Sequence, residues 1–148
     1  MVEHTEEGAF GLVLNRASES TVSDAVPGLV DMAGADEPVW IGGPVGPESV
    51  VVVAEFETPA ESPKLIVGNV GVVDPADEAS LVRARIYAGH SGWGPGQLEA
   101  ELERDAWLIE TASPEDPFRG DDLWSVVLQR RGGESVLLAT MPDDPSLN

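Results

Sequence analysis

RIYAGHSGWGPGQLEAELERDAWLI, residues 85–109, carries the clearest succession of secondary-structure signals in this chain. Residues 85–88 are typical of a strand, because a β-branched and an aromatic residue adjoin and a glycine follows them. Residues 89–96 contain four glycines and predict a loop. Residues 97–104 predict a helix, which begins just after a proline. Residues 106–109 are predicted to be extended again, so that the stretch forms a βαβ-like unit.

The remaining residues predict short strands and helices on both sides of this unit. The hydrophobic patterns predict strands at 2–4, 9–15, 39–41, 50–56, 64–73 and 135–141, with a turn or bulge at Gly68–Asn69. Capping residues predict helices after Ser20 or Thr21, from Asp74 to about Val82, and from Asp121 to Arg131. Residues 16–20 and 30–38 are predicted to be loops, and Trp40, Trp107 and Trp124 are assigned to the core.

A net charge of −19, from 27 Asp and Glu against 8 Lys and Arg, is the most unusual bulk property of the 148 residues. This acidic protein is expected to repel phosphate backbones and anionic lipid, so direct nucleic-acid or membrane binding is disfavoured. The chain has no cysteine, which excludes disulfides and zinc–thiolate sites. It has neither a basic-then-apolar leader nor an apolar run of about 20 residues, and we expect a cytoplasmic protein.

Five motifs follow one another along the chain. They are GAFGLVLNR at 8–16, WIGGPV at 40–45, AGHSGWGPGQLEAEL at 88–102, DDLW at 121–124 and DPSLN at 144–148. Together they resemble the AlgH/YqgE family of bacterial proteins over nearly the whole length of the chain, and the third motif is the most diagnostic.

The resemblance implies an α/β fold, with a mixed, bent, partly barrel-like β-sheet and helices packed on its faces, in a single domain over residues 1–148. It implies little chemistry, because the family is mostly described as uncharacterised, with one branch labelled a transcriptional regulator. Ala17 and His90 stand where the family usually has proline and tyrosine, so no catalytic role is carried over to His90. The strands predicted at 2–4 and 9–15 would form a hairpin with a very short first arm. Because the family also usually begins with further residues, we expect natural residues ahead of Met1.

The glycine-rich run half matches a serine-hydrolase motif. GHSGW at 89–93 has Trp93 in place of the final glycine of G-x-S-x-G, and no histidine follows Ser91. The run also lacks the Gly-Lys-Ser/Thr ending of a P-loop, although a small carboxylate anion stays an alternative ligand. No spacing of histidines or carboxylates is typical of a metal site. We therefore predict no catalytic residue, no cofactor and no metal.

The predicted binding site combines loop ends that leave strands. A tryptophan among glycines fits either core packing or recognition, and loops at strand ends commonly bind ligands in α/β proteins. The predicted ligand- or partner-binding residues are Asn15, Arg16, Gly42, Gly43, Pro44, Trp93 and Gln97.

Our leading hypothesis is a non-catalytic binding or regulatory module that acts through a protein partner or small ligand, both unidentified. One alternative is a hydrolytic enzyme that uses carboxylates near residues 89–96, for example Glu99 with Glu101 or Glu103. The other is a transcriptional regulator, and the negative charge opposes direct DNA binding by it.

Overall fold

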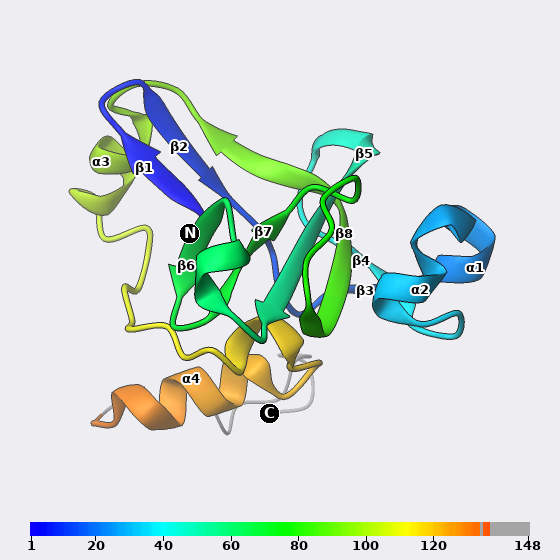
Figure 1. Cartoon of the computed structure of the whole chain (residues 1–148). Coiled ribbons are helices and arrows are strands. Elements are labelled where there is room, and N and C mark those ends of the chain that lie inside the picture. Colours follow the sequence, from blue (N-terminus) through cyan, green and yellow to red (C-terminus); the bar gives the residue numbers. More distant parts are fainter. Residues whose placement is uncertain (134, 137–148) are drawn as a thin grey trace.

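The computed structural model describes residues 1–133 and 135–136 and shows a curled sheet flanked by short helices (Figure 1). The strands are β1 (Glu3–Thr5), β2 (Gly8–Gly11), β3 (Ala17–Thr21), β4 (Pro38–Ile41), β5 (Val45–Phe56), β6 (Lys64–Val67), β7 (Val70–Val73) and β8 (Leu81–Trp93). The helices are α1 (Val22–Ala25), α2 (Val30–Ala33), α3 (Gln97–Leu102) and α4 (Leu123–Arg131), with 3-10 turns η1 (Pro27–Leu29), η2 (Pro59–Glu61) and η3 (Asp116–Phe118). The fold is thus mixed α/β, as expected, although helices are few.

Strand β8 connects the whole sheet. The strand order is β1-β2-β8-β5-β7-β6, and β4 pairs with both β3 and β8. Along one edge β8 pairs antiparallel with β5, while along the other its residues 87–88 pair parallel with β4 and its residues 91–93 pair antiparallel with β2. Each part of this long strand therefore has a hydrogen-bonded neighbour on at least one edge.

The prediction that the strand stops at Ala88 is wrong, because β8 continues through Gly89 and Gly92. The backbone of Gly89 has φ +66°, and carbonyl oxygens of Gly43 and Val45 occupy the space that a Cβ would need. This glycine lets the β4–β5 connection approach the strand closely, and pairing with β5 continues beyond it.

Other predictions depended on local signals that the sheet overrides. Residues 106–109 are not a strand, so the βαβ-like unit is absent. The helix predicted after Asp74 is also absent: the Asp74 carboxylate caps only the N–H of Ala76, and Leu81 pairs with Phe56 in the sheet. Residues 16–20 and 30–38 were predicted to be loops, but most of the first range lies in β3 and the start of the second forms α2.

Several local predictions are confirmed. The β1–β2 hairpin forms, Gly68–Asn69 joins β6 to β7, and the side chain of Thr21 caps α1. Helix α4 ends at Gly132, as predicted. The strand predicted at 135–141 lies mostly outside the described residues, and Ser135 and Val136 are helical.

The core lies on both faces of the β5–β8 pair, because successive side chains of a strand point to opposite faces. Val52, Ala54, Phe56 and Ile86 face α1, η1 and α2. On the other face, Val53 and Tyr87 pack with Trp40, which confirms Trp40 as a core residue. The core assignments of the other two tryptophans are wrong: Trp107 is 49% and Trp124 53% exposed.

The side chains of β8 also hold the segment that precedes α4. The guanidinium of Arg85 lies 3.9 Å from the ring centroid of Trp40 and donates to the carbonyls of Pro117, Phe118 and Arg119. The hydroxyl of Tyr87 donates to the carbonyl of Pro117 at 2.6 Å. Burial raises the pKa of Tyr87 to about 12, so this donor keeps its proton at neutral pH.

Within the described part of the chain, no helix has both the length and the apolar composition needed to cross a bilayer.

Candidate binding groove

A cavity of about 480 Å³ opens between the β1–β2 hairpin, the end of β8, α3 and the segment after α3. Its walls are mainly apolar and come from segments far apart in sequence. They include Leu12, Val13, Trp93, Leu98, Leu102, Trp107 and Ile109. We call this cavity the α3 groove. Its volume is within the range of small-molecule and peptide pockets.

Local sequence features explain how each wall forms. Trp93 is the last residue of β8 and pairs with Ala9 of β2. Its indole lies over Gly11, where a Cβ would come within 3.4 Å of the ring. Leu98 and Leu102 are one helical turn apart, so both face the groove from α3.

Glu101 joins the two tryptophans of the groove. The indole N–H groups of Trp93 and Trp107 both donate to its Oε2, at 3.0 and 2.8 Å, and the side-chain amide of Gln97 donates to its Oε1 at 3.1 Å. The two indole rings meet edge to face, with centroids 5.8 Å apart. The hydrogen bond from Trp107, followed by those from Trp93 and Gln97, lowers the pKa of Glu101. Glu101 therefore ties the segment after α3 to the end of β8.

Two carboxylates lie at the groove, Glu110 in its lining and Glu99 against the lining residue His4. Glu99 follows the lining residue Leu98 and contacts the ring of His4 at 2.5 Å. A backbone hydrogen bond and this histidine contact lower the pKa of Glu99. Glu110 lies at the other end, 3.8 Å from Arg131, whose guanidinium also donates to the carbonyl of Ile109.

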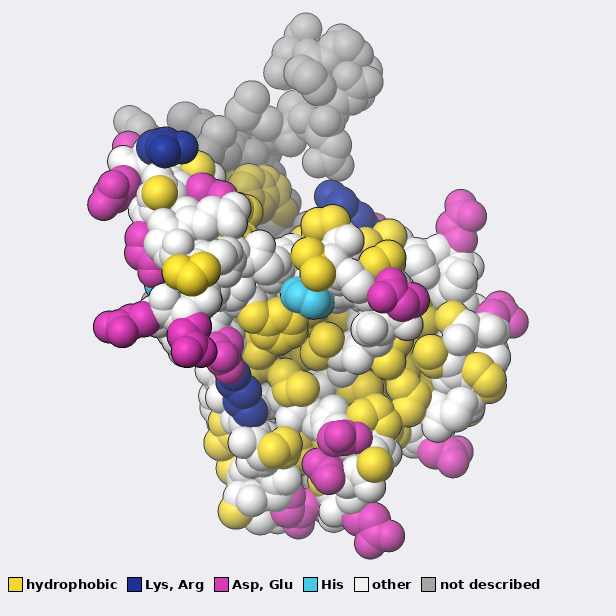
Figure 2. All heavy atoms as spheres, turned by 90° about the horizontal axis from the view of Figure 1, so that it is seen from above, with side chains coloured by type: hydrophobic (Ala, Val, Ile, Leu, Met, Phe, Trp, Pro, Cys, Tyr) yellow, Lys and Arg dark blue, Asp and Glu magenta, His cyan; other side chains and the backbone are white. Residues whose placement is uncertain are grey.

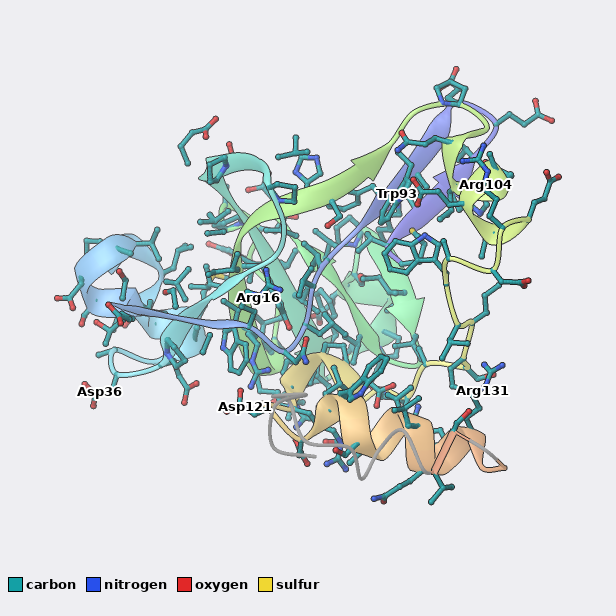
Figure 3. The ribbon with its side chains drawn as sticks, turned by 180° about the vertical axis from the view of Figure 1, so that it is seen from behind. Arg16, Asp36, Trp93, Arg104, Asp121 and Arg131 are labelled. Carbon is teal, nitrogen blue, oxygen red and sulfur yellow. The ribbon has the colours of Figure 1, made fainter. Side chains whose placement is uncertain are left out.

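The structure brings together only part of the predicted site. Trp93 lines the groove and Gln97 lies beside it through Glu101. Asn15, Arg16, Gly42, Gly43 and Pro44 are not among the lining residues. In Figure 3, Trp93 lies at the end of the molecule with α3 and the hairpin, whereas Arg16 lies nearer the middle.

Three of the predicted residues outside the groove, Arg16, Gly42 and Gly43, have structural contacts. The carbonyl of Arg16 accepts from the N–H of Ile41 at 2.7 Å, next to β4. The N–H of Gly42 donates to the carbonyl of Ala88, and the backbone of His90 and Ser91 fills the space of a Cβ at Gly43. These glycines bring β4 against β8. Whether any residue of the predicted set binds a ligand stays a prediction.

Sequence reasoning missed the contribution of Trp107, Leu108 and Ile109. They were predicted to form a strand, yet they lie outside the sheet and are 49%, 52% and 70% exposed. The sequence did contain a signal against a strand at these residues: they come soon after a short helix, and no turn and second strand follow them. An apolar run left there without a strand partner is free to line a surface groove.

The carboxyl groups of Glu99 and Glu101 lack the raised pKa expected of a general acid. A general acid needs a raised pKa, whereas the pKa values of Glu99 and Glu101 are lowered. Ser91 lines the groove, while the ring of His90 packs edge-on against Phe10. Within residues 1–133 and 135–136, no group of three His, Asp or Glu side chains is arranged to hold a metal ion.

A second cavity, of about 380 Å³, is lined by Met32, Glu37, Arg83, Arg85 and Phe118, among others. Arg83 donates to Glu55 and Glu115, and Arg85 to three backbone carbonyls. Because these guanidinium groups already have acceptors, the α3 groove is the stronger candidate site.

Comparison with known proteins places this fold in a family. The model of the AlgH-like family matches residues 1–136. The chain belongs to the AlgH-like family. A protein of Streptomyces avermitilis, described only as a UPF0301 protein, is 41% identical over all of this chain and 83% of its own length. A UPF0301 protein of Mycobacterium tuberculosis is also 41% identical, over all of this chain and 79% of its own length.

Two solved structures share the fold of this AlgH-like chain. A crystal structure of a Corynebacterium diphtheriae protein superposes with a TM-score of 0.84 and 28% identity, over 94% of this chain and 79% of that one. The solution structure of the AlgH protein from Pseudomonas aeruginosa gives a TM-score of 0.71 and 28% identity, over 97% and 82%. The descriptions of these relatives assign no activity, so the function has to be argued from the site.

Proposed function

We propose that this AlgH-like protein is a non-catalytic binding module whose α3 groove holds an apolar ligand or an apolar segment of a partner. The observation that carries the proposal is the tryptophan pair held by Glu101 beside exposed apolar residues. Tryptophans supply large contact areas in binding sites, and a fixed indole loses little conformational freedom when a ligand binds. Any regulatory role would act through such binding.

A neutral apolar dye such as Nile red tests the groove as an apolar binding site. The dye is expected to bind saturably, and Trp107→Ala is expected to weaken binding by about tenfold, equivalent to about 1.4 kcal/mol, because one wall is lost. Dye fluorescence during a protein titration gives both affinities. Trp107 is half exposed, so its removal leaves the β5–β8 core intact.

Trp124→Ala is the matched control, because Trp124 is similarly exposed but belongs to α4. Its dye affinity is expected to equal that of the unaltered protein. Equal losses in the two variants, or dye uptake that never saturates, would show that the groove is not the binding site.

A further inference from the structure

Apolar residues of the α3 groove are exposed in the segment after α3. Leu108 and Ile109 are 52% and 70% exposed, directly after the tryptophan that Glu101 holds. Leu98 and Leu102 of α3 line the same groove. Exposed apolar groups gathered around a hollow are typical of an interaction site.

The lining of the groove favours apolar side chains of a ligand over polar ones. Both oxygens of Glu101 already accept side-chain hydrogen bonds, from Trp93, Trp107 and Gln97. A ligand therefore gains mainly by burying apolar surface against the leucines and indoles. One peptide form suited to such a groove is an amphipathic helix, whose apolar side chains repeat at i, i+3, i+4 and i+7.

The charge around the groove indicates the polar face of such a helix. Glu99 and Glu103 each follow a lining leucine of α3, and Glu110 lies at the far end. The cations near the groove already have acidic neighbours: Lys64 pairs with Glu3 of β1, Arg131 contacts Glu110, and Arg104 follows Glu103. Figure 2, a view from above, shows Asp and Glu side chains greatly outnumbering Lys and Arg on the face that it presents. Lysines or arginines of a partner are attracted to this rim.

The same charge disfavours the other occupants. A second copy of the chain also has a net charge of −19, so two copies repel each other. Anionic lipid and nucleic acid are repelled for the same reason. Resting on the proposed binding function, we propose that the α3 groove binds a cationic amphipathic helix of a protein partner, with the apolar face in the groove and lysine or arginine side chains at its acidic rim.

Three synthetic peptides of equal length test this proposal on the full chain. The first has leucines at i, i+3, i+4 and i+7 and lysines elsewhere; the second has glutamates in place of the lysines; the third scrambles the first. Fluorescence anisotropy at about 0.15 M salt measures each affinity. The first peptide is expected to bind at least about tenfold more tightly than the scrambled one, and the glutamate peptide at least about tenfold more weakly than the first.

Two pairs of variants locate the binding site. Trp107→Ala is expected to weaken binding of the lysine peptide about tenfold, and Trp124→Ala to leave it unchanged. Glu103→Gln is expected to weaken it about two- to fivefold more than Glu48→Gln, a carboxylate in the first part of β5. Rising salt is expected to reduce the difference between the two glutamate variants.

The possible failures are distinguishable. If the scrambled peptide binds as well as the amphipathic one, net charge alone attracts it and the proposal is overturned. It is also overturned if the glutamate peptide binds equally, or if Nile red binds while no peptide does; the proposed binding function survives both results. A dimer in sedimentation that buries Trp107 would replace the partner helix by a second copy. Failure of the dye as well as the peptides would overturn both proposals.

Discussion

Glu101 shows how one residue organises the candidate site. Its carboxylate accepts from two indoles and one amide that come from β8, α3 and the segment after α3. Hydrogen bonds to the charged form of a carboxyl group favour that form. The lowered pKa of Glu101 and the position of Trp107 are thus two consequences of the same contacts.

We expect the indole N–H signals of Trp93 and Trp107 to shift together in an acid titration followed by NMR. The midpoint should lie below the ordinary pKa of a glutamate, because the donors hold Glu101 in its charged form. The contacts are therefore complete at neutral pH and are lost as the pH falls through the lowered pKa. In Glu101→Gln this transition should disappear.

Trp40 and Trp124 are internal controls for that titration, since neither indole donates to Glu101. Separate midpoints for Trp93 and Trp107, or a shared midpoint at the ordinary glutamate pKa, would contradict the shared contact.

At the scale of elements, the segment before α4 depends on ion pairs as well as on β8. Asp116 is 5% exposed in η3 and accepts from both terminal nitrogens of Arg130 in α4, at 2.6 and 2.9 Å. It also accepts from the N–H of Ser113 at 2.8 Å. The salt bridge therefore fastens α4 to the turn that Arg85 and Tyr87 hold against the sheet.

Asp116→Asn is expected to lower the free energy of unfolding by about 1–3 kcal/mol, because buried charge-assisted hydrogen bonds are lost. The hydrogen bond from Arg130 lowers the pKa of Asp116, so the folded state binds fewer protons than the unfolded state in mild acid. The contribution is therefore present at neutral pH and is lost as the pH falls through the lowered pKa. Urea denaturation at several pH values measures both effects.

Asp36→Asn provides the comparison, because Asp36 is exposed in the connection between α2 and β4. It should stay within about 0.5 kcal/mol of the unaltered protein. If Asp116→Asn shows the same stability and the same pH dependence as this control, the salt bridge does not fasten α4.

For the whole molecule, we expect the net charge to favour one class of partner over another. With 27 acidic against 8 basic side chains, the protein lacks the cations that neutralise phosphates in nucleic-acid complexes. The same field attracts basic peptides and slows self-association. We therefore propose that charge acts through the choice of partner, while the fold depends on the apolar pattern.

We expect no DNA complex in a mobility-shift titration at about 0.15 M salt, whatever the sequence of the duplex. Electrostatic repulsion should prevent a non-specific complex at lower salt as well. A complex that forms at low salt and weakens steeply as salt rises would show direct phosphate contacts and would favour the DNA-binding alternative.

Part of the fold and site could be predicted from local sequence. The hairpin turn at Gly68–Asn69 and the cap at Thr21 follow from turn and capping chemistry within a few residues. Helix α4 ends at Gly132 as predicted, but the prediction that Asp121 caps it is wrong, because α4 begins at Leu123 without a side-chain cap. Five motifs taken together suggested the family, and the glycine-rich one at 88–102 was the most diagnostic. Trp93 was identified as a candidate because a tryptophan among glycines needs a packing or binding role.

The rest depended on pairing between distant segments. By its local sequence Gly89 is typical of a loop. In the structure it belongs to β8, because pairing with β5 continues beyond it and Gly43 approaches it closely. Residues 106–109 carry a strand pattern, but without a neighbouring strand to satisfy their backbone they instead form a wall of the α3 groove. The sequence by itself thus determined charge, turns, caps and family, because these depend on composition or on neighbours along the chain. Only the tertiary structure decided the extent of β8, because strand pairing between residues far apart in sequence stabilises it. It also decided the α3 groove: the contacts of Glu101 span only four to eight positions, but the opposite lining comes from the distant β1–β2 hairpin.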